Sequence, residues 1–266
     1  MSAWRNETGR PLSSAAWLDA HHQAKLPERT SFARGLAKYR PKRLVDLGCA
    51  TGLWLDLMDK VLSPQCEFVG IDSDPHAIDV ARDRARSWAR SAEFLLCDIA
   101  SEPEQIPESD LALAFNIFPY LPSASELLER LFEQQRTRRA VVRQYDGGTI
   151  RIGPMSPDDR YAIDSSLRAS LESSAEFSHY DMDRTYEVLR ASGLAVERLD
   201  FELTQRHAPF PAEFIDFFAA TTDWMSGHLS DDGRARLSGI LAGWTPTGGS
   251  LYFEQVDLVA VLSAAS

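Results

Sequence analysis

The sequence predicts an α/β fold, namely a doubly wound, mostly parallel, seven-stranded sheet with helical cap elements. Short apolar segments of strand length alternate with segments of helical periodicity along most of the chain. Several of the strand-like segments end in an acidic residue or in a turn, as strands do at the ligand-binding edge of a parallel sheet. A composition that is 44% hydrophobic over 266 residues is sufficient for one large core.

The predicted strands cover residues 43–47, 66–71, 92–97, 110–115, 139–145, 194–203 and 251–262. Two helices are expected before the first strand, at residues 14–20 and 31–37. Further helices are expected after residue 52, near 77–81, and at 125–132, 157–173, 185–189, 212–225 and 231–244. Asp74 precedes Pro75 and therefore suits the N-cap of the helix that contains 77–81.

The turn after the first strand is the most informative stretch. Asp46 ends an apolar run, and Gly48 and Gly52 follow in a G-x-x-x-G spacing before a helical segment. Glycines let the backbone approach a ligand closely, and the N–H groups of the next helix point at the same place. The spacing differs from the G-x-G-x-x-G fingerprint of dinucleotide-binding proteins.

Residues 46–52 resemble motif I of class I S-adenosylmethionine (SAM)-dependent methyltransferases, with Ala50 at the position of a third glycine. The resemblance implies SAM as cofactor and methyl transfer to a small-molecule acceptor (O, N or C), in bacterial-type secondary or specialised metabolism. It also implies a cap at residues 1–38 and a SAM-binding domain at 39–266, with inserts at about 147–182 and 207–248. The motif residues expected at the cofactor are Asp46, Gly48, Cys49, Ala50 and Gly52.

Acidic residues after the second and third strands extend the resemblance. Asp72 ends the second strand about twenty residues beyond the glycine turn, where a carboxylate accepts hydrogen bonds from both ribose hydroxyls. Ser73 follows it. In the resembling family an acidic residue at the position of Asp98 binds the adenine amino group, and its apolar neighbour, here Ile99, packs on the ring.

The end of the fourth strand is expected near the reactive methyl group. Asn116 and Phe118 are assigned to the cofactor site and Tyr120 to the acceptor site. One of the two aromatic rings is expected to do no more than pack under the following helix.

The helical cap carries further candidates. In similar methyltransferases an arginine before the first strand meets the methionine carboxylate, and Arg29 and Arg34 are the candidates, with Arg29 preferred. Trp17 is assigned to the acceptor. Adjacent helical residues diverge, so His21 and His22 are interpreted as a surface pair and not as metal ligands.

The acceptor side is predicted from the fifth strand and the long segment after it. His179, Tyr145 and Asp146 are the catalytic candidates, and His179 is the preferred base because its ordinary pKa of roughly 6.5 suits neutral pH. Arg143, Tyr180 and Trp224 are assigned to substrate binding, and Phe210 and Phe214 are expected to line a lid. The alternative for residues 179–184 is a helix cap made by Asp181 or Asp183.

Composition excludes several classes of protein. A net charge of −11 without a basic run disfavours a nucleic-acid partner, and no apolar run approaches the roughly 20 residues of a membrane span. Cys49, Cys66 and Cys97 lack metal-ligand spacing, no metal is expected, and no signal peptide is apparent. We expect a cytoplasmic protein with no membrane partner, and we allow for a homodimer.

Two other functions remain open from the residues. An NAD-dependent oxidoreductase would also use Asp72, although the glycine spacing argues against it. A protein that binds SAM as a scaffold, or that catalyses a reaction other than methyl transfer, would have the same motifs.

Overall fold

The computed structural model describes residues 14–173, 181–245 and 248–265, and it confirms the doubly wound α/β fold. Its strands form a single 8-stranded sheet. They are β1 (Arg43–Leu47), β2 (Glu67–Asp72), β3 (Ala92–Leu96), β4 (Leu111–Phe115), β5 (Arg139–Tyr145), β6 (Arg151–Gly153), β7 (Ala195–His207) and β8 (Tyr252–Ser263).

The strand order is β3-β2-β1-β4-β5-β8-β6, with β7 paired to β8. The first five strands pair in parallel, whereas β8 runs antiparallel to β5, β6 and β7. All seven predicted strands are present, and β6 is the additional one. It was not predicted because its three residues lie in a segment interrupted by glycine and proline, which indicates a loop.

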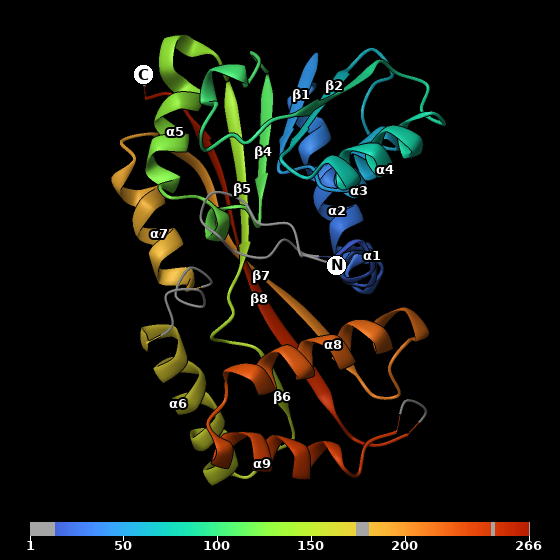
Figure 1. The fold of residues 1–266 in the computed structure, drawn as a ribbon, viewed down its shortest axis with the longest axis vertical. Helices are drawn as coiled ribbons and strands as arrows, with labels where there is room; N and C mark the ends of the chain where they lie inside the picture. Colours follow the sequence, from blue (N-terminus) through green and yellow to red (C-terminus); the bar gives the residue numbers. More distant parts are fainter. Residues whose placement is uncertain (1–13, 174–180, 246–247, 266) are drawn as a thin grey trace.

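Helices cover both faces of the sheet (Figure 1). They are α1 (Ala15–Ala24), α2 (Leu26–Leu36), α3 (Leu53–Asp59), α4 (Pro75–Ala85), α5 (Ala124–Phe132), α6 (Pro157–Ser173), α7 (Met182–Ala191), α8 (Ala212–His228) and α9 (Asp231–Leu241). Residues of α2, α3 and α4 pack on one face with Leu44, while those of α5 and α7 pack on the other with Val45. Because β1 is buried on both faces, its residues after Arg43 are all buried and do not alternate between buried and exposed.

A third core lies beside the main sheet, in the lower half of Figure 1. The strands β7 and β8, 13 and 12 residues long, extend past the parallel strands and carry Phe253 into this region. There Phe253 packs with Ile152 of β6, Ile163 of α6, and Phe214 and Phe217 of α8. The two segments predicted as inserts therefore share one core, and α1 packs against it through α8.

Two predicted helix caps are confirmed. The side chain of Asp74 accepts a hydrogen bond from the N–H of His76 at the start of α4, at 2.9 Å. Asp181 accepts one from the N–H of Asp183 at the start of α7, at 3.1 Å. The helix start near residue 182 is thus encoded by a local carboxylate cap.

Candidate active site

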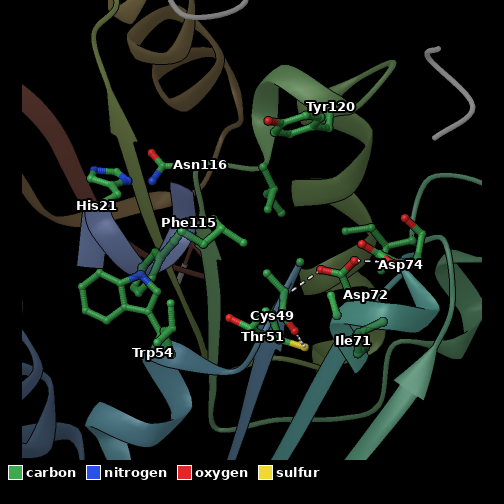
Figure 2. A pocket seen from close by; sticks show the side chains of 18 of the residues that line it. His21, Cys49, Thr51, Trp54, Ile71, Asp72, Asp74, Phe115, Asn116 and Tyr120 are labelled. Atoms are coloured by element: carbon green, nitrogen blue, oxygen red, sulfur yellow. Dashed lines mark hydrogen bonds between the residues drawn. The ribbon is translucent and has the colours of Figure 1, made fainter. Parts of the chain in front are cut away.

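A pocket opens where the carboxyl ends of β1, β2 and β4 meet (Figure 2). The glycine turn forms its floor, and α1 and α2 add one wall. Of the residues predicted for the cofactor, acceptor or catalysis, these line it: Trp17, Arg29, Gly48, Cys49, Ala50, Asp72, Ser73, Asp98, Ile99, Asn116, Tyr120 and Tyr145. Strand ends from separate parts of the sequence therefore converge on one site, as the sheet topology requires.

Every second residue of the glycine turn, from Gly48 to Gly52, has a backbone in the left-handed region. The φ angles of Gly48, Ala50 and Gly52 are +67°, +46° and +76°. A Cβ on Gly48 would lie 2.4 Å from the side chain of Ile117, so only glycine fits there. Ala50 has room for its methyl group but keeps a backbone conformation that L-residues disfavour.

Gly52 does not line the pocket, contrary to its assignment to the cofactor. It is the N-cap of α3, and a Cβ placed on it would lie 3.2 Å from Ala81 of α4. Its structural role is therefore to bring α3 and α4 close together.

Asp72 is held by two backbone donors. Its Oδ2 accepts a hydrogen bond from the N–H of Ala50 at 2.7 Å, and its Oδ1 accepts one from the N–H of Asp74 at 2.9 Å. Burial raises the pKa of this carboxyl group, although the two hydrogen bonds act in the opposite direction. Each carboxylate oxygen has a second lone pair, so the side chain can still accept hydrogen bonds from a ligand in the pocket.

Asp98 and Ile99 follow β3 on the same side of the pocket. The Oδ1 atom of Asp98 accepts a hydrogen bond from the N–H of Ala100 at 2.9 Å, which fixes the carboxylate in a turn. Both residues line the pocket. Their contact with an adenine ring stays a prediction.

Asn116 ends β4 in the left-handed region, with φ +56°. Its N–H donates to the carbonyl of Arg143 at 2.8 Å, and its Oδ1 accepts from the N–H of Tyr145 at 3.2 Å. These two bonds to β5 hold the strained backbone in place. Non-glycine residues in this conformation concentrate at functional sites.

Arg29 is the pocket-lining member of the two arginine candidates. Its guanidinium is 5% exposed, lies 4.9 Å from the Trp54 ring and donates from Nη1 to Nδ1 of His22 at 2.8 Å. Its buried Nε has no hydrogen-bond partner, and no carboxylate of the described residues forms an ion pair with it. Burial, followed by the charge of Arg143, lowers the pKa of this guanidinium. Arg34, in contrast, is exposed on α2.

The interpretation of His21 and His22 as a surface pair is wrong, because both are buried. The two side chains do point in different directions, as predicted for adjacent helical residues, but each of them is buried against other parts of the protein. The ring of His22 points to Arg29 and Trp54. The ring of His21 packs in a cluster with Trp17 and Phe217 and lines the pocket. Burial lowers the pKa of His22 to about 3.

Arg143 does not reach the pocket as a substrate residue. Its Nη2 lies 2.7 Å from Oδ2 of Asp257, and its Nη1 lies 2.6 Å from Oε2 of Glu202. Lys25 donates to the other oxygen of Asp257 at 3.2 Å. We name Lys25, Arg143, Asp257 and Glu202 the buried ion cluster. It ties the end of α1 to β5, β7 and β8, so the sequence assignment of Arg143 to the acceptor is corrected.

Three further residues that the sequence assigned to the site, Asp46, Phe118 and Asp146, do not line the pocket. Their side chains are buried in a core or in a turn. Asp46 is 2% exposed below the turn, where burial and then the charge of Asp72 raise its pKa. Phe118 is the aromatic ring that packs, in the core formed with α5. Asp146 accepts from the N–H of Gly148 at 3.0 Å in a buried turn.

The predicted lid aromatics of the second insert belong to the third core. Phe210 and Phe214 are buried in it, and Trp224 packs on its edge, with its ring 4.8 Å from that of His228. None of the three lines the pocket. His179 and Tyr180 lie outside the described residues.

Several lining residues were missed by sequence reasoning. They are Leu18, His21, Thr51, Leu53, Trp54, Ile71, Asp74, Ala77, Cys97, Phe115, Ile117 and Leu121. Most are apolar residues at strand ends and helix starts, where the sequence pattern is the same for a core position and a pocket position. Trp54, directly after the glycine turn, carried a usable signal because helix N-termini at this edge face the ligand.

Within the described residues, no group of three or more histidine, cysteine, aspartate or glutamate side chains is arranged to hold a metal ion. None of the helices in the described ranges has the length and apolar character needed to cross a bilayer.

Comparison with known proteins finds similarity to methyltransferases. Residues 45–135 match the family model described as a methyltransferase domain. A carboxy-S-adenosyl-L-methionine synthase from Trichodesmium erythraeum is 28% identical over 100 residues, which cover 36% of this chain and 40% of that protein.

Two solved structures share the fold. A putative methyltransferase from Bacillus halodurans aligns over 89% of this chain and 99% of its own, with a TM-score of 0.56 and 10% identity. The YcgJ protein from Bacillus subtilis aligns over 90% of this chain and 100% of its own, with a TM-score of 0.54 and 14% identity. Residues 45–135 therefore match a methyltransferase domain, and the chain as a whole has the class I methyltransferase fold.

Proposed function

We propose that this protein transfers the methyl group of SAM to a small-molecule acceptor. The observation that carries the proposal is the division of charge around one pocket. Asp72 and Asp74 lie on one side of it, and His21, Trp54 and Asn116 on the other (Figure 2). Arg29 stacks on Trp54 on that second side. A ligand with hydroxyl groups at one end and a carboxylate at the other fits this arrangement.

The residues of the pocket fit SAM group by group. Asp72 would accept hydrogen bonds from the ribose hydroxyls, and Asp98 with Ile99 would hold the adenine ring. Arg29 would pair with the methionine carboxylate, because it is a buried cation whose Nε lacks a partner. Removing the charge of such a group from water is costly unless an anion compensates it, so an anionic ligand group is expected there.

SAM supplies a methyl group on a positively charged sulfur, which needs no further activation. The protein's own contribution is to fix the two reactants and to exclude water. Positioning alone can supply roughly 7–11 kcal/mol of the barrier reduction. Asn116, Tyr120 and Tyr145 line the same pocket and would hold the acceptor.

We further propose that α1 and α2 act as the cap over this site. Trp17, Leu18 and His21 of α1 and Arg29 of α2 form a wall of the pocket, although they precede the first strand in sequence. The base predicted at His179 stays a prediction.

A small molecule is the acceptor class that the charge favours. The net charge of −11 opposes association with a phosphate backbone.

A homodimer is a separate proposal, supported by the edge strand β7, where Phe201 and Leu203 are 56% and 49% exposed. Unpaired edges with apolar residues favour strand pairing between copies, which light scattering after gel filtration would detect.

Calorimetric titration with SAM, S-adenosylhomocysteine and NAD tests the cofactor. We expect binding of the first two and none of the third. Mass spectrometry of a reaction with candidate acceptors should then show S-adenosylhomocysteine together with an acceptor heavier by one methyl group. Binding of NAD in place of SAM would contradict the proposal.

A second candidate function is modification of SAM itself, because one curated relative is a carboxy-S-adenosyl-L-methionine synthase. Its match covers 40% of that protein and lies in part of the chain only. The same mass spectra distinguish the two functions, since carboxy-SAM as the product, without S-adenosylhomocysteine release, would identify the second.

A further inference from the structure

We infer that the acceptor reacts as an anion, an ionised hydroxyl, thiol or carboxyl group bound between His21 and Asn116. This inference rests on the proposed methyl transfer and adds the chemical class of the acceptor. It is drawn from the donors that this part of the pocket offers and from the charges around it.

The first observation is the fixed position of His21. Its ring lies 5.6 Å from Trp17 and 5.2 Å from Phe217, at interplanar angles of 23° and 10°, and its edge contacts Tyr145 at 6.1 Å. The residue is 6% exposed and lines the pocket. The Trp17 and Phe217 centroids are themselves 5.6 Å apart, so the three rings form one cluster that holds the imidazole in place.

The second observation is that polar atoms here lack partners. The Nε2 atom of His21 is buried and has no hydrogen-bond partner among the described residues. Asn116 uses its Oδ1 for the N–H of Tyr145, while its amide nitrogen donates to no described residue. A buried polar group without a partner is destabilising, so a ligand group that pairs with Nε2 of His21 would explain its placement. The half-buried Asn116 lies on the same side of the pocket (Figure 2) and offers its amide nitrogen to the same ligand group.

The third observation is the charge around His21. Lys25, Arg29 and Arg143 all act on the ring from α1, α2 and β5, and together with burial they lower the pKa of His21 well below 6.5. His22 contributes in the same direction. The imidazole is therefore neutral at physiological pH and is a weak base, but it can donate one N–H.

The cations are not all compensated. Asp257 and Glu202 pair with Lys25 and Arg143 in the buried ion cluster, which leaves Arg29 as the unmatched charge. With the methionine carboxylate on Arg29, the sulfonium of SAM adds a further positive charge beside the acceptor. This potential lowers the pKa of an acidic acceptor group and stabilises its anion.

The reaction then needs no base in the pocket. The acceptor loses its proton to solvent on binding. A lone pair of the anion forms the bond to the methyl carbon, the carbon–sulfur bond breaks, and its electron pair stays on sulfur to give S-adenosylhomocysteine. His21 and Asn116 hold the anion in line and release the neutral methylated product, which their donors bind less well.

The test compares benzoate with benzamide, two probes of equal size that differ in charge. Each is titrated by calorimetry into the full-length protein saturated with S-adenosylhomocysteine and, separately, with SAM. Arg29 is already paired in both, and the sulfonium charge is present only with SAM. We expect benzoate to bind about 10-fold more tightly than benzamide, the usual effect of a hydrogen bond to a charged group. Its affinity should be flat between about pH 6 and 8, because His21 does not titrate there.

Two variants locate the effect. His21→Phe keeps an aromatic ring beside Trp17 and Phe217 and removes the nitrogens, so benzoate binding should fall about 10-fold while benzamide binding and Tm are retained. Asn116→Asp keeps the acceptor for Tyr145 but replaces the donor by a negative charge, and it should abolish benzoate binding and spare benzamide. His207→Phe, at an exposed position of β7, is the control.

The outcomes against the proposal are distinct. If benzoate binds no more tightly than benzamide, or if both site variants bind it as wild type does, the acceptor is not an anion at this position. Benzoate binding only without S-adenosylhomocysteine would assign the anion site to the cofactor carboxylate alone. An affinity that rises as pH falls would show that protonated His21 is the binding form. SAM binding, measured separately, would still stand in each case.

Discussion

The carboxylate of Asp72 links the end of β2 to the glycine turn, because its Oδ2 accepts a hydrogen bond from the N–H of Ala50 at 2.7 Å. The other oxygen accepts from the N–H of Asp74 at 2.9 Å. One side chain thus orders two loops that line the pocket, in addition to the ribose contact proposed for it.

Replacing Asp72 with alanine should weaken SAM binding by about 1.5–3 kcal/mol, because the ribose hydroxyls lose a charged acceptor. Calorimetry measures the loss directly. Asp79→Ala, at an exposed position of α4, should leave SAM affinity unchanged. If Asp72→Ala binds SAM like the wild type, the ribose lies elsewhere.

Gly48 and Gly52 should respond differently to substitution. A side chain on Gly48 displaces Ile117 of the pocket, so Gly48→Val should abolish SAM binding. Gly52→Ala instead presses on Ala81 between α3 and α4, and both the contact and the positive φ should lower stability by about 1–2 kcal/mol. Thermal unfolding and SAM titration of both variants separate a role in binding SAM from a role in packing the helices. If the two variants change Tm and SAM affinity to the same extent, the two glycines do not have different roles.

Ala50→Gly should stabilise the protein by about 0.5–1 kcal/mol, since alanine in the left-handed region is strained by more than glycine costs in chain entropy. The N–H that binds Asp72 is kept. Urea unfolding gives the difference, and a less stable glycine variant would show that the turn tolerates alanine without strain.

The architecture was predictable because each βα unit has a local signature. The apolar run of β1, the turn at Gly48, the carboxylate at the end of β2 and the cap at Asp74 are all short-range features, and the order of parallel strands brings their ends together. The three residues of β6 could not be predicted as a strand. Their pairing with the end of β8 is a long-range contact, and a strand this short shows no alternation of apolar and polar residues in the sequence.

The candidate site was predictable only in part, for the same reason. Positions at strand ends follow from topology, but the direction of a side chain after a strand does not. Phe118 packs into the core and Tyr120 lines the pocket, although they are two residues apart. The burial of His21 depends on α8, whose Phe217 is almost 200 residues later in the chain, so no local pattern could reveal it.

Arg29 and Arg34 give a matched test of the cofactor carboxylate, because they lie on the same helix and differ in burial. Arg29→Gln should weaken SAM binding by about 10- to 100-fold, the range for a lost charge-assisted hydrogen bond in a buried site. Thermal unfolding of the free protein separates this loss from the effect of the lost contacts with His22 and Trp54. Arg34→Gln should change neither quantity. A normal affinity in Arg29→Gln would place the methionine group away from α2.

The buried ion cluster should make stability depend on pH below the neutral range. Burial alone would raise the pKa of Asp257, but Lys25 and Arg143 lower it to about 2, below its value of 3.8 in the unfolded chain. A folded-state pKa below the unfolded one means that the contribution to stability is fully present above about pH 4. It is lost as pH falls through about 2, where the folded protein takes up the proton.

Asp257→Asn should therefore lower the free energy of unfolding at pH 7 by about 3–5 kcal/mol, because Lys25 loses its carboxylate and Arg143 retains only Glu202. Urea unfolding at pH 7 and near pH 3 measures both the loss and its pH dependence. The difference between wild type and variant should shrink at the lower pH, where Asp257 begins to titrate in the wild type. Asp223→Asn, on the exposed side of α8, should leave the unfolding curves unchanged. A variant that is as stable as the wild type at pH 7 would show that the cluster contributes no net stability, and that α1 is held against the sheet by its apolar contacts alone.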